Sequence, residues 1–232
     1  MTALKGPRVS VASRTGWHGD SLGFVLPDGS VLGDGSARVY FADDRASQVY
    51  VKTGGDFQKW QDGIAELVPG NSRLVLSLCA AFASPLLRFA TVVNSTIVNI
   101  YGESSRGKST TSFLYGSVWG GDMERPEMRF AHPWKQTANN AVALCAAHSG
   151  IGMIFDELKL CPNPGEIAYA VSMGEEKGRQ DANLQMREAR RWRLIVFSTG
   201  EKTLDEAIEE HERRDNTTCF RDFGRGCGSI GL

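Results

Sequence analysis

Residues 96–110 read TIVNIYGESSRGKST. The segment begins with a β-branched run, which favours a strand, and continues into a loop bounded by Gly102 and Gly107. From Gly102 to Ser109 it fits the pattern G-x-x-x-x-G-K-[ST] without a mismatch. The pattern also lies where it is required, between a predicted strand and a predicted helix that starts near Lys108.

This pattern predicts a phosphate-binding loop. The glycines let the backbone wrap around phosphate oxygens, and the N–H groups and positive end of the helix point inward. Lys108 is expected to reach the β- and γ-phosphates of ATP, and Ser109 to ligate Mg²⁺. A plain Gly/Ser-rich turn is the alternative, and the preceding strand argues against it. The predicted ATP-binding residues are Gly102, Glu103, Ser104, Ser105, Arg106, Gly107, Lys108, Ser109 and Thr110.

An acidic pair follows a second predicted strand, residues 151–155. Asp156 and Glu157 come directly after this apolar run, and Asp156 lies 48 residues after Lys108. We predict that Asp156 orients the magnesium shell and that Glu157 polarises the attacking water. Taken alone, the pair would also suit a helix N-cap with an acid in the first turn.

A third predicted strand, residues 194–197, ends in Ser198 and Thr199. Either hydroxyl could hydrogen-bond the γ-phosphate or the attacking water, which is a sensor role. A simple turn over residues 198–200 is supported equally by the spacing. Strands alternate with helices here, so the sequence predicts a parallel α/β sheet with one site at its carboxyl edge.

Composition excludes several classes of protein. The chain has 232 residues, of which 41% are hydrophobic and 23% charged, with a net charge of -1, so it is neither disordered nor fibrous. The near-neutral net charge gives no overall electrostatic attraction to nucleic acid or to an anionic membrane. The longest apolar run, residues 74–87, is predicted to be a core helix too short to span a bilayer. Five cysteines without a C-x-x-C pair indicate reduced thiols, and we predict a cytoplasmic protein that does not bind membranes.

The N-terminal region has a different pattern. Strand-prone pieces at 24–26 and 30–32 flank the turn residues 27–29 and predict a hairpin, and another strand is predicted at 48–52. We therefore expect a β-rich and helical region over residues 1–69 and a P-loop ATPase domain over residues 70–232.

Helical spacing of apolar residues begins near Asp56. It predicts one helix up to Leu67 and a second from Ser72 to Phe82. Ser84 and Pro85 are then a suitable N-cap and first-turn pair for one more short helix.

The chain resembles the DUF927 family, the predicted ATPase domain of Cch-like helicases of phages, plasmids and staphylococcal-cassette-type mobile elements. The resemblance spans roughly residues 16–210 and rests on the order and spacing of several blocks. They are Trp17-His18-Gly19, Phe24 to Gly29, Gly70 to Leu74, Ala81 to Leu87, the phosphate-binding loop, Ser117 to Gly120, Trp134 to Asn139, Asp156-Glu157-Leu158 and Ser198 to Glu201.

The resemblance implies a P-loop fold of the additional-strand type, related to hexameric and AAA+-like helicases. It matches Gly102, Gly107, Lys108, Ser109 and Thr110 to the nucleotide loop, Asp156 and Glu157 to the acidic pair, and Ser198 and Thr199 to the sensor strand end. It also implies a role in replicating or mobilising element DNA.

Some positive residues are candidates for contacts with DNA or with a neighbouring subunit. Lys177 and Arg179 lie beside glycines in a predicted loop, and a solvated charged face is the equal alternative for them. The Gly-Gln-x-x-Arg block expected after the sensor strand has no clear counterpart. The arginine finger is therefore unassigned, with Arg221 the nearest candidate, followed by Arg213, Arg214 and Arg225.

A zinc site is rejected for Cys145, His148 and Cys161, because their spacing matches no common zinc pattern and small thiols on an apolar helix usually pack in a core.

Together these features predict a magnesium-dependent ATPase of helicase type that forms a homo-oligomeric ring and acts on DNA, in single-stranded form. One alternative is an ATP-dependent binding or assembly switch with little turnover and no strand separation. Another is an inactive fragment of a longer chain.

Overall fold

The N-terminal part of the chain forms two small sheets. The computed structural model describes residues 10–12, 14–18, 23–33, 39–41, 49–51, 54–91, 94–121, 130–176 and 189–226, with the backbone alone for 216–226. Strand β1 (Ser10–Ala12) pairs in parallel with β5 (Val39–Phe41). An antiparallel sheet contains β2 (Gly16–Trp17), β3 (Phe24–Val25) and β4 (Val31–Leu32).

The hairpin predicted around residues 27–29 is confirmed by the pairing of β3 with β4. The strand predicted at 48–52 is wrong for its described part, because residues 49–51 pair with no strand. Val49 instead buries its side chain in a core cluster with Phe24 and residues of the helical body. Burial of Val49, with Val51 packed against the same cluster, holds this segment in place without strand pairing.

The next segment is helical, as predicted, but its boundaries differ. Helix α2 (Phe57–Gly63) is capped by the Asp56 side chain and followed by the 3-10 turn η1 (Ala65–Leu67). Helix α3 (Ser72–Leu86) then continues past the expected end at Phe82 into the 3-10 turn η2 (Leu87–Phe89).

The prediction that Ser84 and Pro85 start a new helix is wrong. Ser84 is buried inside α3, and its hydroxyl accepts a hydrogen bond from the Ile195 N–H at 3.2 Å. Pro85 lies in the last turn, where its missing N–H costs one helical hydrogen bond. The Ser84 hydroxyl therefore binds the Ile195 amide of β9 and does not cap a helix.

Because the helix is longer than expected, the stretch Ser72–Phe89 is long and apolar enough, by length and composition, to cross a membrane. This differs from the prediction made from the apolar run alone. Its buried residues include Ser77, whose hydroxyl donates to the Thr111 carbonyl of α4 (Lys108–Val118). These contacts pack one side of the helix against α4, and 22% of the stretch is buried.

The central sheet has four parallel strands in the order β6-β9-β8-β7, which confirms the predicted parallel sheet. Strand β6 (Thr96–Tyr101) has the predicted bounds, β7 covers Ala131–Pro133, and β8 covers Met153–Asp156. Strand β9 (Ile195–Gly200) lies between β6 and β8 and is buried at every position. Residues 198–200 belong to this strand, so they do not form a turn.

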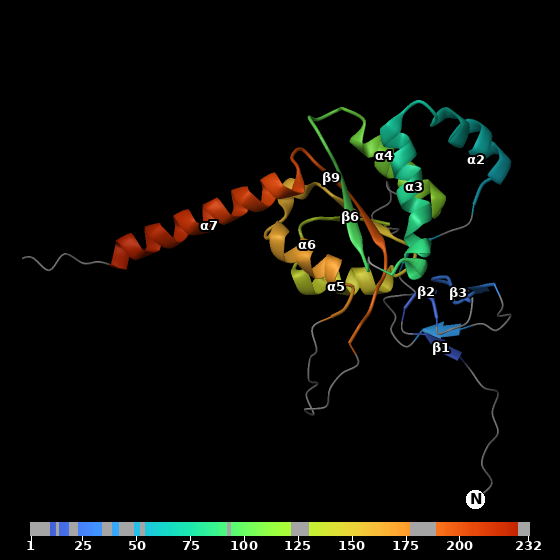
Figure 1. Cartoon of the computed structure of the whole chain (residues 1–232), viewed down its shortest axis with the longest axis horizontal. Coiled ribbons are helices and arrows are strands. Elements are labelled where there is room, and N and C mark those ends of the chain that lie inside the picture. The colour runs from blue at the N-terminus through green and yellow to red at the C-terminus, as the bar shows by residue number, and fades with distance from the viewer. Residues whose placement is uncertain are drawn as a thin grey trace, which may run out of the picture.

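Helices cover both faces of the sheet (Figure 1). On one face α3 and α4 pack against β9. On the other lie α5 (Ala138–Ala147) and α6 (Pro164–Met173), and η4 (Leu158–Leu160) connects β8 to α6. Side chains alternate between the two cores: Val196 of β9 joins the α5–α6 cluster, whereas Ile195 and Phe197 join the α3–α4 cluster.

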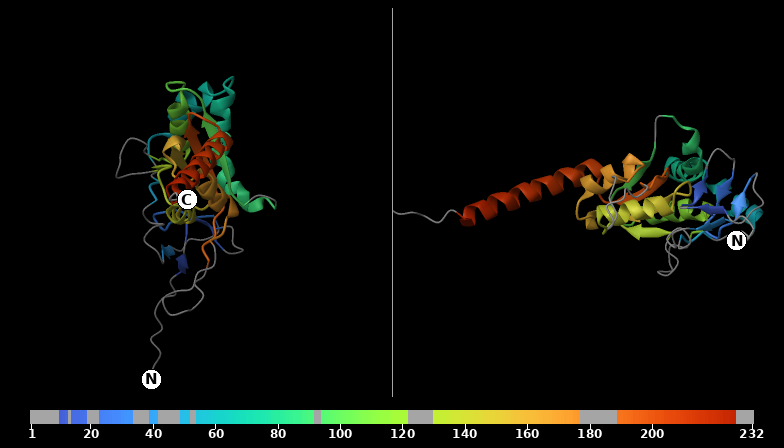
Figure 2. Two further views of the ribbon diagram at one scale, coloured as in Figure 1. Left: turned by 90° about the vertical axis from the view of Figure 1, so that its left-hand side faces the viewer. Right: turned by 90° about the horizontal axis from the view of Figure 1, so that it is seen from below.

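The last helix, α7 (Leu204–Gly226), begins beside η4 and α6 and extends away from the rest of the protein (Figures 1 and 2). The N-terminal sheets lie against the opposite end of the body, where the Trp17 indole donates to the Pro85 carbonyl at 2.8 Å. This arrangement leaves the carboxyl edge of the central sheet between the loop after β6 and the start of α7.

Candidate functional site

The predicted site residues from three strands come together in one cleft of about 460 Å³ at the carboxyl edge of the sheet. We call it the carboxyl-edge cleft. Ser198, Gly102, Glu103 and Arg106 are not among its lining residues. Those that line it are Ser104, Ser105, Gly107, Lys108, Ser109, Thr110, Asp156, Glu157, Leu158, Lys159, Thr199, Gly200 and Glu201.

The loop between β6 and α4 adopts a conformation suited to anions. Gly107 has φ +83° and is the N-cap of α4, a backbone conformation that glycine adopts without steric cost. No side chain caps this helix, so its first N–H groups are not blocked by a capping oxygen. Ser105 also has a positive φ, +60°, which is unusual for a residue with a side chain. The sequence between two glycines thus forms a tight turn over an uncapped, positive helix end.

Lys108 folds back over the loop. Its Nζ donates to the carbonyl oxygens of Gly102 and Glu103, at 2.7 Å in each case. Both acceptors are neutral, and Lys108 forms no ion pair among the described residues. The positive charge is therefore held at the mouth of the loop by two neutral oxygens.

The acidic pair is tied to β9 through Thr199. Its hydroxyl donates a short hydrogen bond to Asp156 Oδ1 and accepts one from the Glu157 N–H at 3.4 Å. The strand register causes this, because Phe155 pairs with Ser198, which brings the next residue on each strand to the same face. Glu157 has φ +61°, and it lies just after the end of β8. One carboxylate oxygen of Asp156 is thus fixed, and the Glu157 side chain is exposed beside it.

Ser198 points to the opposite face of β9. Its hydroxyl accepts from the Trp134 indole N–H at 2.9 Å and donates to the Asn99 side-chain carbonyl at 2.8 Å. Asn99 in turn donates to the Lys202 carbonyl at 3.1 Å. Ser198 and Trp134 are both fully buried. This chain of hydrogen bonds crosses the sheet from β7 to β6, so of the two predicted sensor residues only Thr199 faces the cleft.

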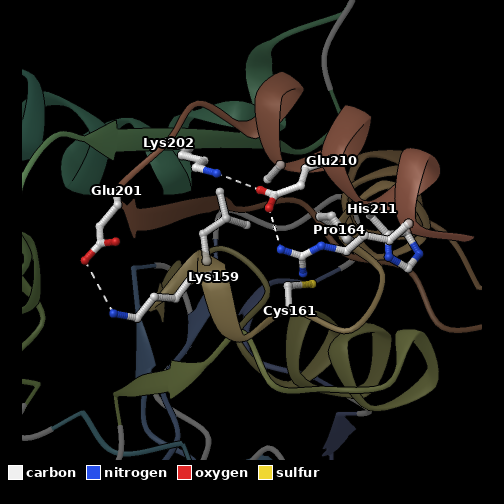
Figure 3. Close-up of a pocket in the computed structure, with 10 residues that line it drawn as sticks. Lys159, Cys161, Pro164, Glu201, Lys202, Glu210 and His211 are labelled. Carbon is white, nitrogen blue, oxygen red and sulfur yellow. Dashed lines mark hydrogen bonds and ion pairs between the residues drawn. The ribbon is translucent and has the colours of Figure 1, made fainter. Parts of the chain in front are cut away.

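A second, smaller depression of about 230 Å³ adjoins the cleft and shares Leu158, Lys159 and Glu201 with it. Figure 3 shows it between η4 and α7. Lys159 pairs with Glu201 at 3.4 Å across the boundary between the two. Sequence reasoning missed Lys159, because a lone lysine after an acidic pair matches no motif.

The α7 side of this depression is charged. Glu210 of α7 accepts from Lys202 at 2.7 Å and also from Arg214. Burial raises the pKa of the Cys161 thiol on the opposite wall to about 11, so this cysteine is a neutral thiol at physiological pH. Leu204 and Ala207 hold the start of α7 at this depression, because they pack against the core cluster that contains Leu158.

A family model described as "Domain of unknown function (DUF927)" matches residues 2–191. The chain belongs to the DUF927 family. The match ends before β9, so Thr199 and Ser198 lie outside the residues that it covers. No curated protein matches the chain.

The DUF927 chain is also similar to a solved structure titled "SCCmec type IV Cch - active helicase". The TM-score is 0.67 at 19% sequence identity, and the similarity covers 88% of this chain and 38% of the neighbour's. At this identity the likeness concerns the fold. The chain thus shares a mixed α/β fold with a helicase structure and spans well under half of that structure's length.

The remaining predicted positions of this DUF927 chain fall elsewhere. Lys177 and Arg179 lie outside the described residues, and so do the side chains of Arg221 and Arg225. Arg213 and Arg214 lie on α7, paired with Glu209 and Glu210 of the same helix. Among the described residues, no arginine lines the carboxyl-edge cleft.

No group of three or more His, Cys, Asp or Glu side chains that could hold a metal ion occurs in the part of the chain that the structure describes. Burial raises the pKa of the Cys145 thiol and lowers that of His148 to about 4. The His148 ring donates from Nδ1 to the Leu144 carbonyl at 2.9 Å. Both residues are neutral packing residues in this DUF927 chain.

Proposed function

We propose that this DUF927 chain is the ATP-binding and ATP-hydrolysing module of a helicase-type protein that acts on DNA. The observation that carries the proposal is the carboxyl-edge cleft. There the loop before the uncapped helix α4, the acidic pair and Thr199 meet. The strand order supports the additional-strand class of P-loop fold, because β9 separates the loop-bearing β6 from the acidic β8.

The cleft suits the triphosphate of a nucleotide. The turn at Ser105 and Gly107 exposes backbone N–H groups at a helix start, and such groups bind phosphate oxygens. Lys108 holds its charge with two neutral carbonyls, from which it can shift to a phosphate without breaking an ion pair. We therefore assign the phosphates to this loop.

The donor atoms also suit Mg²⁺, which prefers oxygen ligands. Ser109 and Asp156 both line the cleft and would hold the ion, which when bound there neutralises charge on the phosphates. Asp156 uses one carboxylate oxygen for Thr199, which orients the other. Glu157 is the general base of the proposal, because its exposed carboxylate stands next to Asp156 in the same cleft.

No arginine lines the described part of the cleft, and this bears on whether one copy of the chain can hydrolyse ATP by itself. Trans arginines stabilise the charge that develops on the transferred phosphoryl group. Among the residues that the structure describes, Lys108 and Lys159 are the ones that supply positive side chains to this cleft. We therefore propose that a single copy turns over slowly and that a homo-oligomer supplies the missing charge; a switch without turnover is the alternative outcome.

The test uses two variants and a control. We expect Lys108→Ala to lose binding of a fluorescent ATP analogue, and Glu157→Gln to bind it normally but to lose at least about a hundredfold in turnover, the usual size of a general-base contribution. Glu209→Gln removes one carboxylate from exposed α7 and should match the wild type in both assays. Turnover that survives Glu157→Gln would disprove the role given to Glu157, and nucleotide binding that survives Lys108→Ala would disprove the site.

A further inference from the structure

Another cavity, of about 670 Å³, lies at the amino edge of the central sheet, at the opposite end of the strands from the carboxyl-edge cleft. Four arginines line it, and we call it the arginine pocket: Arg14, Arg88, Arg191 and Arg193. Arg14 precedes β2, Arg88 lies in η2 after α3, and the other two lead into β9. Three segments that are far apart in the sequence thus bring their guanidinium groups to one place.

Among the described residues that line the arginine pocket, positive side chains outnumber negative ones. Its lining residues carry four arginines and one carboxylate, Glu175, which leaves a net charge of +3 (4 − 1 = 3). Glu175 pairs with Arg191 at 3.2 Å. Burial, followed by the nearby charges of Arg193, Arg191 and Arg88, lowers the pKa of Arg14. Mutual repulsion in a partly buried place is relieved when an anion binds.

Neutral groups hold Arg14 and Arg193 in position. Arg14 donates to the Ser149 hydroxyl at 2.9 Å. Arg193 donates to the carbonyls of Leu87 and Arg88, at 3.4 and 3.0 Å. The Arg88 guanidinium lies over the Trp17 ring, 5.3 Å from its centre. The contacts of Arg14 and Arg193 orient a guanidinium without cancelling its charge, and a guanidinium has five N–H donors.

We propose that the arginine pocket binds phosphate groups of a single-stranded nucleic acid backbone. Guanidinium forks match the geometry of phosphate, and a cavity with several forks suits consecutive phosphates along one strand. The proposal deepens the proposed function, because a DNA-coupled ATPase needs a nucleic-acid surface separate from its nucleotide site. The six residues of β9 separate the two places by about 20 Å, so both ligands can bind at once.

The test measures the affinity of the full chain for a fluorescein-labelled oligothymidylate over a series of salt concentrations. The variant Arg88→Gln/Arg193→Gln removes two charges, and for single strands each lost phosphate contact reduces the slope of log affinity against log salt by about 0.7. We expect a slope smaller by about 1.4 and an affinity lower by roughly tenfold for each arginine.

The matched control is Arg73→Gln. Arg73 lies in the first turn of α3, and the 15 residues of that helix place it about 22 Å from the arginine pocket. It should bind the oligonucleotide within about twofold of the wild type. The variant Arg88→Lys/Arg193→Lys keeps both charges and should recover most of the salt slope. Equal melting temperatures for all variants show that the losses do not come from unfolding.

The outcomes distinguish the possible ligands. Wild-type affinity in the double glutamine variant overturns the proposal. Inorganic pyrophosphate that competes as well as oligothymidylate, measured in a Lys108→Ala background to silence the carboxyl-edge cleft, assigns the pocket to free phosphates instead. Polyglutamate that competes equally well assigns it to an acidic protein segment. The chain could bind the oligonucleotide through these arginines and yet show no ATP turnover. In that case the ATPase proposal fails, and the arginine pocket is still a nucleic-acid site.

Discussion

The hydroxyls of Ser198 and Thr199 are adjacent in the sequence but lie on opposite faces of β9, so we predict that their removal has different results. Ser198→Ala leaves the buried Trp134 indole N–H without its acceptor. An orphaned buried donor costs about 1–3 kcal/mol, and 1 kcal/mol lowers the Tm of a domain of this size by about 2–4 °C. For ~2 kcal/mol we expect a Tm lower by about 4–8 °C.

Thr199→Val removes the hydrogen bond to Asp156 while keeping the shape of the side chain. A hydrogen bond to a charged group contributes about 1.5–3 kcal/mol, and we take the lower value because Asp156 is exposed to water. If the bond orients Asp156 for catalysis, 1.4 kcal/mol corresponds to about a tenfold drop in ATP turnover. The Tm should fall less than in Ser198→Ala, because water replaces the lost partner of an exposed carboxylate.

The assay compares turnover with thermal melting, at a temperature well below both melting points. Ser198→Ala should keep turnover within about twofold of the wild type, as a distant stabilising site does. Adding Trp134→Phe removes the orphaned donor, so the double variant should be more stable than the sum of the single losses predicts. A turnover loss in Ser198→Ala as large as in Thr199→Val would refute the assignment of the two hydroxyls to different faces.

Three further predictions concern stability. Gly152→Ala should prevent soluble expression or lower the Tm strongly, because Gly152 has φ +89° and an added Cβ would overlap the Tyr115 hydroxyl. Ser84→Ala should cost about 1–3 kcal/mol in urea denaturation, because it orphans the buried Ile195 N–H; equal stability would mean that water replaces the hydroxyl. Burial lowers the pKa of His148 from 6.5 to about 4, so the unfolded chain takes up a proton first as the pH falls. Stability should therefore decrease between pH 6.5 and 4 by up to about 1.4 kcal/mol per pH unit, and urea titrations of His148→Gln should lack that contribution to the slope.

The parts of the fold that sequence predicts well are those specified by local signals. Strand β6 has the predicted bounds because a β-branched run ends at a glycine. Asp156 closes a short apolar run that is buried on both faces, as in other parallel sheets. In such segments neighbouring residues in the sequence decide the structure, so the local residue pattern is sufficient to predict the strand.

The parts that sequence did not predict depend on distant partners. Ser84 has the residue type of an N-cap, but the amide that uses its hydroxyl is 111 positions away. The distinction between Ser198 and Thr199 follows from the register of β9 with its neighbours, which spacing does not give. Arg193 matches no motif, and the packing of α3 against β9 brings it beside Arg88. The arginine pocket has no motif because three separate segments build it.

The position of β9 also determines the order in which the protein can fold. It is the last of the four described strands to be synthesised, and within the described part of the chain it is the one strand that pairs with β6. The first pair in their register, Thr96 with Ile195, is 99 positions apart, so closure of the sheet requires a large loop to form and is slow. A chain still on the ribosome therefore exposes both edges of β6 until residue 200 has emerged. Asp156 and the loop after β6 meet only when β9 inserts between them, so a nucleotide bound in the carboxyl-edge cleft, as we propose, would stabilise the state in which β9 has inserted and no earlier one.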